Sequence, residues 1–309
     1  MANTLVLKAS RALRGQALAV EGRRRGAWRG GLQGSDFTWA IAFVVPYAAV
    51  FLAFVAYPVF YGLWLGHMPS LYGELMSDPV YQRALGNTII YLAIGVNLKM
   101  FGALLLSGFF MRRGWVKGLL LIYVLPWAVP ALPSFISIHW MLNGQWGFLN
   151  NLIWDLFGID GPGWVETSRW LALGSVITTH IWKWMPFWTV ILLAGRMAIP
   201  QELYEAAEVD GATGLRRFTH VTFPLLANLY LICTLLSTLF TLGEFNEVFF
   251  VTGGGPALST HVLSTLGIRN AFEVARPDLG VATVMTALPL MIPLVILLMR
   301  KLRTTAVQL

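Results

Sequence analysis

Long apolar runs dominate the sequence, and six of them approach the length that a helix needs to cross a bilayer. A span takes about 20 residues at a rise of about 1.5 Å each. The six runs cover residues 37–66, 86–111, 118–142, 170–195, 225–250 and 279–299. Several contain prolines, which membrane helices tolerate where neighbouring groups satisfy the freed backbone. The pattern predicts an all-α, polytopic membrane protein with six transmembrane helices.

The composition agrees with a membrane protein and excludes several other protein classes. Of the 309 residues, 57% are hydrophobic and only 12% are charged, whereas a soluble domain carries about 25% charged residues. Cys233 is the single cysteine, which excludes a disulfide scaffold. The net charge of +7 comes from residues at the ends of the apolar runs. Membrane topology therefore explains it better than a nucleic-acid partner does.

Lysine and arginine are distributed unevenly between the two sides of the predicted membrane. Sixteen lie in the basic tail 1–36, in the loops after the second and fourth runs, and at the C-terminal end. The opposite side has four, namely Arg83, Arg169, Arg269 and Arg276. The positive-inside rule predicts that both termini are cytoplasmic. The expected organisation is a cytoplasmic tail 1–36, which does not read as a secretory signal, a transmembrane domain 37–303 and a short cytoplasmic tail 304–309.

The longest predicted cytoplasmic loop, residues 196–224, has the pattern of two short helices. Pro200 suits a first helical turn, and three glutamates follow at a three-residue spacing near the positive helix end. Gly211 ends or bends that helix, and apolar residues from Leu215 to Phe223 predict a second short helix. Two short helices that project from the membrane in this way offer a surface that a cytoplasmic partner protein can bind.

The same loop resembles the EAA motif of ABC-importer permeases. Glu205-Ala206-Ala207 is followed after three residues by Gly211 and, after nine more, by Val221-x-Phe223-Pro224. The family pattern ends in Ile-x-Leu-Pro, so two apolar residues differ. Trp182-Lys183-x-Met185-Pro186-Phe187 and Thr252-Gly253-Gly254-Gly255-Pro256 resemble the sugar-permease (maltose/glycerol-phosphate-type) branch. The resemblance extends over about residues 37–303.

The resemblance implies a type I ABC-importer permease fold and a transport subunit that is not an enzyme. The chain would form half of a translocation path for a carbohydrate or a related polyol or sugar phosphate in a bacterial inner membrane. Its loop would dock on a separate ATPase, through Glu205, Ala206, Ala207, Asp210, Gly211, Arg216 and Pro224.

The same resemblance implies several partners. They are a second permease, usually a different chain, two ATPase subunits and an extracytoplasmic solute-binding protein. No G-x-x-x-x-G-K-[S/T] loop occurs in the sequence. ATP and Mg are therefore expected on the ATPases, and no cofactor on this chain. The glycine-rich segment from Gly253 to Pro256 lacks the lysine of a phosphate loop and is interpreted as an outer turn that faces a partner.

Charged residues inside membrane runs are functional candidates because burying them in lipid is expensive. Polar residues of the fourth and fifth runs recur at helical spacing and each set shares one face. The residues expected to line the substrate path are His180, Lys183, Trp184, Phe187, Ser237, Thr241, Glu244 and Glu247.

Alternatives stay open for several polar residues. Lys183 could instead pair with Glu244 only to satisfy a buried charge, and Lys99 is interpreted mainly as structural. His139 and Trp140 could line the cavity or anchor an interface.

Two other functions remain possible from the sequence. A proton-coupled secondary transporter would use Glu244 and Glu247, but no inverted repeat is visible. A membrane-embedded enzyme would need a polar catalytic cluster, and these two carboxylates alone are a poor candidate. No two histidines are spaced as metal ligands, so a zinc site is not expected. Contact with membrane lipid is expected, and contact with nucleic acid is not.

Overall fold

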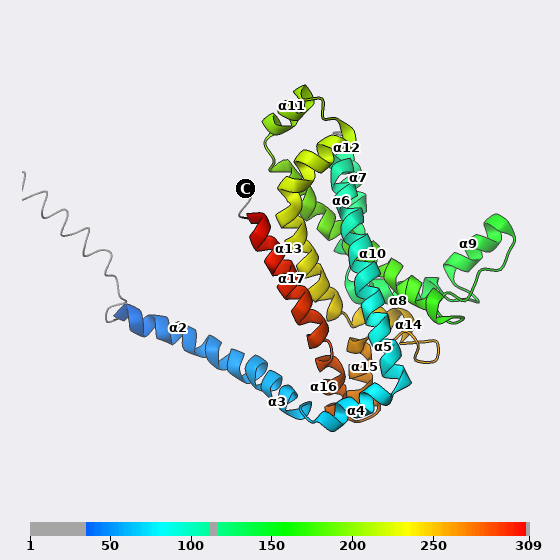
Figure 1. The fold of residues 1–309 in the computed structure, drawn as a ribbon. Helices are drawn as coiled ribbons and strands as arrows, with labels where there is room; N and C mark the ends of the chain where they lie inside the picture. Colours follow the sequence, from blue (N-terminus) through cyan, green and yellow to red (C-terminus); the bar gives the residue numbers. More distant parts are fainter. Residues whose placement is uncertain (1–34, 112–115, 307–309) are drawn as a thin grey trace, which may run out of the picture. The chain divides into compact units, whose positions relative to one another are not determined.

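The computed structural model describes residues 35–111 and 116–306, and within these ranges every regular element is a helix (Figure 1). The expected tail 1–36 lies outside the described residues up to residue 34. The same is true of Arg112 and Arg113 in the loop after the second run, and of residues 307–309. The chain divides into two compact units, one up to Tyr61 and one from Gly62 onward.

The described part of the first unit, from Ser35 onward, is one long apolar helix. It comprises α2 (Ser35–Phe51), a π-helical turn η1 (Leu52–Ala56) and the start of α3 (Tyr57–Leu65). None of its residues from 38 to 61 is buried within the chain, and Phe43 and Phe54 are 74% and 76% exposed. A helix that is apolar on all sides suits a membrane rather than water. The predicted run 37–66 is confirmed as a helix.

The second unit is a bundle of helices joined by short elements (Figure 1). Its first half contains α4 (Pro69–Ser77), α5 (Pro79–Ile90), η2 (Tyr91–Val96), α6 (Asn97–Met111), α7 (Val116–Ala128), α8 (Ala131–Met141), α9 (Phe148–Phe157) and α10 (Arg169–Met197). Its second half contains α11 (Gln201–Val209), α12 (Gly214–Arg217), η3 (Phe218–Thr222), α13 (Phe223–Leu242), α14 (Asn246–Thr252), α15 (Leu263–Ile268), η4 (Arg269–Glu273), α16 (Pro277–Met285) and α17 (Leu288–Ala306).

Four helical stretches of the described chain are long and apolar enough to cross a membrane. They are Thr38–Leu65, Pro79–Met111, Gly214–Leu242 and Pro277–Leu297, and α7 with α8 makes a fifth if this bent pair is one span. The helix α10 has 29 residues but contains His180, Lys183 and Arg196, which make it more polar. The chain is thus a multi-pass membrane protein.

Two predicted spans are broken, which corrects the expectation of continuous helices. The run 118–142 bends by 91° between α7 and α8, because Pro130 and Pro133 supply no N–H to carry the helix across the break. The run 225–250 is interrupted at Gly243–Phe245, so Glu244 follows the end of α13 and Glu247 lies on α14. These two carboxylates therefore do not share one helical face with Ser237.

The loop 196–224 also differs from its prediction in one respect. Its first helix forms as expected, as α11. The expected second short helix is instead the beginning of a long one, because α12, η3 and α13 run on without a break from Gly214 to Leu242. The loop therefore runs without interruption into the helix that carries Ser237 and Thr241.

One of the buried hydrophobic clusters of the bundle lies where α6, α10 and α13 meet, next to the pocket described below. Met100, Leu192 and Leu226 are at most 2% exposed in a cluster that also contains Trp188 and Cys233. At Gly195 a Cβ would lie 2.3 Å from Leu229 Cδ2, so glycine permits the close approach of α10 and α13.

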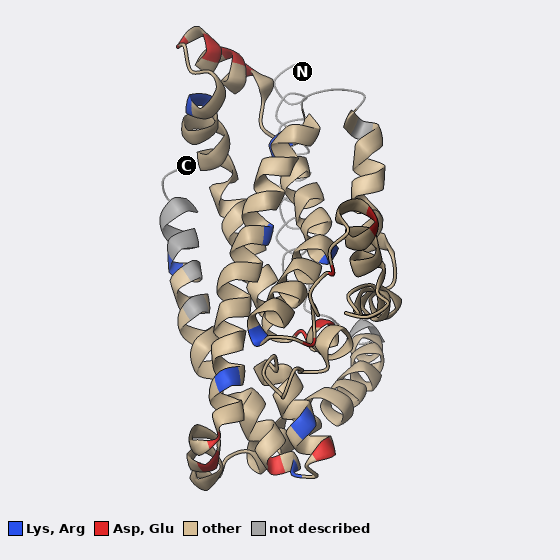
Figure 2. Ribbon diagram, turned by 90° about the vertical axis from the view of Figure 1, so that its right-hand side faces the viewer, with Lys and Arg blue, Asp and Glu red and all other residues tan. Residues whose placement is uncertain are grey.

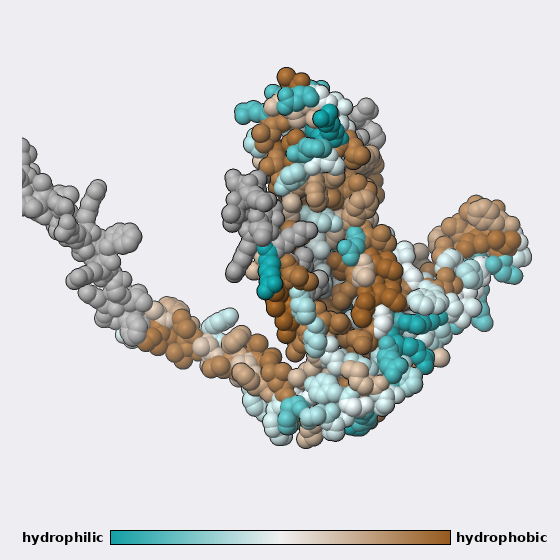
Figure 3. All heavy atoms as spheres, viewed as in Figure 1, coloured by the Kyte–Doolittle hydropathy of each residue, from teal (hydrophilic) through white to brown (hydrophobic). Residues whose placement is uncertain are grey.

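Charge and hydropathy both follow the long axis of the bundle. Many charged residues lie at its two ends, and acidic residues occur at both, on α11 at one end and at the opposite end as well (Figure 2). Apolar side chains cover much of its sides (Figure 3). This is the distribution that a lipid environment selects.

Candidate functional site

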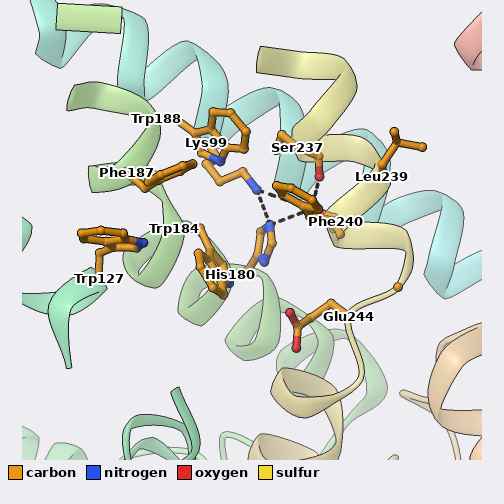
Figure 4. A pocket seen from close by; sticks show the side chains of 12 residues that line it. Lys99, Trp127, His180, Trp184, Phe187, Trp188, Ser237, Leu239, Phe240 and Glu244 are labelled. Carbon is orange, nitrogen blue, oxygen red and sulfur yellow. Dashed lines mark hydrogen bonds between the residues drawn. The ribbon is translucent and has the colours of Figure 1, made fainter. Parts of the chain in front are cut away.

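A pocket of about 510 Å³ opens between α6, α7, α10 and α13 (Figure 4). The break after α13 closes one side of it, so that a carboxylate from the break and hydroxyls from α13 reach the same space. Aromatic rings from α7, α10 and α13 form most of the wall. The lining residues are Lys99, Trp127, His180, Trp184, Phe187, Trp188, Ser237, Leu239, Phe240, Thr241, Gly243 and Glu244.

The aromatic wall is built from rings in mutual contact. Trp127 and Phe187 are stacked with centroids 5.4 Å apart, and Phe187 meets Trp188 edge-on at 4.9 Å. Trp188 in turn lies 6.5 Å from Phe240 of α13. Offset and edge-to-face pairs of this kind fix ring orientation. The pocket therefore presents fixed apolar faces beside a few polar groups.

A buried hydrogen-bond network supports the polar side of the pocket. Glu247 is fully buried and accepts from the Tyr91 hydroxyl and from Trp184 Nε1. His180 Nδ1 lies 2.7 Å from Glu247 Oε2, and Lys99 Nζ lies 2.7 Å from His180 Nε2. The network joins η2, α6, α10 and α14 across 156 residues of sequence.

The order of donors in this network follows from its chemistry. An ionised Glu247 can only accept, so the Nδ1–H of His180 donates to its carboxylate. Nε2 of the imidazole then accepts from the Lys99 ammonium. A positive and a negative charge are thus joined through a neutral imidazole. Thr241 Oγ1 lies 3.3 Å from His180 Nε2 and adds α13 to the network. Satisfied networks of this kind rigidify a site.

Two polar groups face the pocket without a strong partner. Ser237 Oγ is buried and has no hydrogen-bond partner, although buried hydroxyls are ordinarily bonded. The Glu244 carboxylate accepts a hydrogen bond from the backbone N–H of Asn246 at 3.0 Å, and no cation of the described chain pairs with it. Both groups are placed to bond a polar molecule in the pocket.

Lys183, expected on the substrate path, does not line this pocket, and it does not form the alternative pair with Glu244. Its Nζ donates to the carbonyls of Pro126 at 2.8 Å and Val129 at 2.5 Å, and lies 3.3 Å from Ser134 Oγ. These carbonyls are left without helical partners where α7 breaks before α8. Lys183 therefore caps a broken membrane helix.

Other sequence candidates are divided between the pocket and its support. His180, Trp184, Phe187, Ser237, Thr241 and Glu244 line the pocket, whereas Glu247 lies behind it. His139 Nδ1 lies 2.9 Å from the carbonyl of Val251, and Trp140 packs on Trp146 with centroids 4.6 Å apart. Neither of these two lines the pocket.

Sequence reasoning missed the aromatic residues Trp127, Trp188 and Phe240, and it interpreted Lys99 as structural. A charged residue inside a membrane run was the available signal for Lys99. In an apolar run, aromatic residues carry no such signal. Within the described ranges, no group of three histidine, cysteine or acidic residues is placed to hold a metal ion.

The end of α11 has the geometry of a Schellman motif. The N–H of Ala212 donates to the carbonyl of Ala207 at 2.8 Å, and that of Gly211 to Glu208 at 3.0 Å. Gly211 has φ +73°, a conformation that glycine adopts without strain. Residues of the EAA pattern surround this turn, and Glu205, Ala206, Asp210, Arg216 and Pro224 are exposed while Ala207 is buried.

On the opposite end of the bundle, the glycine-rich segment is held by a buried asparagine. Asn87 Nδ2 donates to the carbonyls of Ser259 at 2.7 Å and His261 at 2.8 Å. Arg169 in turn donates to Asn87 Oδ1. Burial, helped by the nearby charge of Arg269, lowers the pKa of His261 to about 4.

Comparisons with known proteins agree with this architecture. Residues 100–302 match the family described as "Binding-protein-dependent transport system inner membrane component". The chain is 30% identical to the sulfoquinovosyl glycerol transport system permease protein SmoG of Agrobacterium fabrum over 299 residues, which cover 90% of this chain and 95% of SmoG. It is also 30% identical to the trehalose/maltose transport system permease protein MalF of Thermococcus litoralis over 260 residues, covering 77% and 85% of the two chains.

A solved structure shows the same fold. A chain of a bacterial alginate ABC transporter in complex with an alginate pentasaccharide-bound periplasmic protein superposes with a TM-score of 0.76 at 22% identity. The match covers 84% of this chain and 92% of that one. By family match and by similarity to full-length relatives, the chain belongs to the binding-protein-dependent transport system inner membrane components, the permeases of ABC transporters.

Proposed function

We propose that this chain is the permease subunit of an ATP-driven, binding-protein-dependent ABC importer and forms half of the path for a carbohydrate or a related polyol or sugar phosphate. It crosses a bacterial inner membrane six times, with both termini in the cytoplasm. The five stretches named above and the 29-residue α10 would supply these crossings. The lysine and arginine distribution sets the orientation.

The observation that carries the proposal is the composition of the central pocket. Stacked rings such as Trp127 and Phe187 offer flat apolar faces that suit the C–H face of a sugar ring. Ser237 Oγ has no partner within the chain, and a sugar hydroxyl would supply one. The Glu244 carboxylate lies on the same wall and would accept from a second hydroxyl. Apolar faces with a few convergent polar groups are typical of small-molecule sites.

Coupling to ATP is proposed for the α11 turn. Its EAA residues are exposed at one end of the bundle, where a separate ATPase would dock. Because α12, η3 and α13 are continuous, a push on this turn would move Ser237 and Thr241 at the pocket. ATP and Mg would be held by two ATPase subunits. A second permease would supply the opposite wall, and an extracytoplasmic binding protein would deliver the solute.

The pocket assignment is tested by Ser237→Ala in the complete transport complex, reconstituted in proteoliposomes with its binding protein. Loss of one hydrogen bond to the solute should weaken apparent affinity for transport by roughly three- to tenfold. Stability should stay the same or rise, because a buried hydroxyl without a partner is removed. Labelled maltose, trehalose and an alginate oligosaccharide serve as probes.

Thr238→Val is the matched control. Thr238 is the next residue of α13 and donates within its own helix to Thr234, outside the pocket. Its substitution should leave uptake unchanged. Equal uptake by the wild type and Ser237→Ala for every transported probe would contradict the pocket assignment.

A further inference from the structure

A buried arginine at the end of α10 has no acidic partner. Arg196 is only 7% exposed, and its guanidinium donates to Ser107 Oγ at 2.8 Å and to the carbonyl of Leu104 at 3.0 Å. The ring of Phe218 covers it, with the guanidinium carbon 5.5 Å from the centroid. Among the residues that the structure describes, no carboxylate forms an ion pair with it. A buried cation without a counter-charge is costly, so its persistence calls for an anion.

Arg196 lines an open pocket of about 800 Å³ that is separate from the central one. A second cation, Arg217, lines the same pocket, and Tyr204 lies beneath its guanidinium at 5.8 Å. Arg217 is 41% exposed, and its nearest carboxylate, on Glu208, is 3.9 Å away and 68% exposed. Such an exposed pair contributes little. Gln201 and Thr222 add polar atoms, and no lining residue is acidic.

The wall of this pocket on α6 is apolar and open to the surroundings. Phe101 and Leu105 are 55% and 54% exposed, and Phe109 and Met111 are each 45% exposed. These side chains lie on a helix that is long and apolar enough to cross the membrane. The pocket therefore joins a cationic end, near α11, to an apolar strip that continues along a membrane helix.

We propose that this pocket binds an anionic phospholipid of the cytoplasmic leaflet. The phosphate would bond to Arg217 at the mouth and compensate the charge of Arg196 deeper in the pocket. One acyl chain would lie along Phe101, Leu105 and Phe109. Arginine suits phosphate because its planar guanidinium offers paired donors. The inference rests on the orientation given under the proposed function, in which α11 faces the cytoplasm.

The combination of a cationic end and an apolar strip favours a lipid over other anions as the ligand of this pocket. A free phosphate would use the two guanidinium groups but would leave the strip on α6 unexplained. A docking ATPase would contact the tip of α11, whereas the strip faces the apolar surroundings of a membrane span. Anionic lipids are concentrated at the cytoplasmic surface and attract basic groups placed there.

The test uses the complete complex purified in detergent, with native mass spectrometry as the readout. Palmitoyl-oleoyl phosphatidylglycerol is titrated against the wild type, Arg217→Gln and Arg196→Gln, and phosphatidylcholine is the neutral comparison. The wild type should retain phosphatidylglycerol, and each variant should bind it roughly tenfold more weakly, as expected for loss of one charged hydrogen-bond donor. Arg300→Gln is the matched control. It removes the same charge, but Arg300 is exposed on α17 and lies outside this pocket.

Arg217→Gln keeps the test decisive if Arg196→Gln does not assemble. Undiminished lipid retention in Arg217→Gln would overturn the proposal. Displacement of phosphatidylglycerol by millimolar inorganic phosphate would show a free-anion site, which also overturns it. Loss of the ATPase from Arg217→Gln with unchanged lipid retention would assign the pocket to the ATPase instead. Lipid retention by a complex that transports no sugar would count against the proposed function alone.

Discussion

Replacing Glu247 by alanine removes the acceptor at the centre of the buried network. Tyr91, Trp184 and His180 each donate to this carboxylate, and the charge of Lys99 reaches it through His180. One unsatisfied buried donor costs about 1–3 kcal/mol, and a buried charge that loses its partner costs about 3–5 kcal/mol. Because the groups relax together, these terms overlap and do not add. The free energy of unfolding should therefore fall by about 3–5 kcal/mol.

Thermal unfolding of the purified complex, followed by tryptophan fluorescence, measures this loss. At about 2 °C per kcal/mol for a chain of this size, Tm should fall by roughly 6–10 °C. A double variant, Lys99→Met with Glu247→Gln, removes both charges and should recover part of the stability. Glu166→Ala is the control, since Glu166 is an exposed acidic residue outside the network. An unchanged Tm in Glu247→Ala would refute the argument that the network supports the pocket.

Three further changes have defined outcomes. Gly211→Ala should reduce the amount of sugar taken up per ATP hydrolysed, because φ +73° strains a residue with a Cβ by about 1–2 kcal/mol. The control Gly73→Ala, at a helical glycine, should leave that ratio unchanged. Equal ratios in the two variants would contradict the role of Gly211 in coupling. Lys183→Met should lower Tm with the loss of two carbonyl partners, and an unchanged Tm would show that water replaces the cap. The free energy of unfolding should decline as pH falls from 6.5 toward 4, because His261, outside the spans, has a pKa of about 4 when folded and 6.5 when unfolded. His261→Gln should make this pH dependence weaker. An unaltered pH dependence in that variant would show that His261 is not its cause.

Hydropathy predicted where the helices lie but not where they break. The runs 37–66 and 170–195 correspond closely to helices, because lipid imposes both length and composition. Gly243–Phe245 interrupts the run 225–250 at Glu244, beside Asn246 and Glu247. The helical spacing of Glu244 and Glu247 was interpreted as one polar face of a continuous helix, although a glycine followed by polar residues also suits the end of a helix. Pro130 is apparent in the sequence, yet membrane helices often tolerate proline. The break becomes evident only in the structure, where the chain bends by 91° and Lys183 binds the freed carbonyls.

The candidate site was predictable for its polar residues and not for its aromatic ones. Ser237 and Thr241 are four residues apart, and this spacing, which is evident in the sequence, places them on one face of a helix. The partnership of Tyr91 with Glu247 joins residues 156 positions apart, and no local pattern reports it. Trp127 belongs to the wall only because α7 ends beside α10. Tertiary packing decides such contacts.

The central claim is that ATP hydrolysis by partner subunits drives import through this chain. The most direct measurement is uptake of labelled maltose or trehalose into proteoliposomes that contain the complete complex. The account predicts uptake only when ATP is supplied to the ATPase side and the binding protein to the other, with no response to an imposed proton gradient. Gradient-driven uptake by the purified chain without any ATPase would contradict the account and support a secondary transporter that uses Glu244 and Glu247.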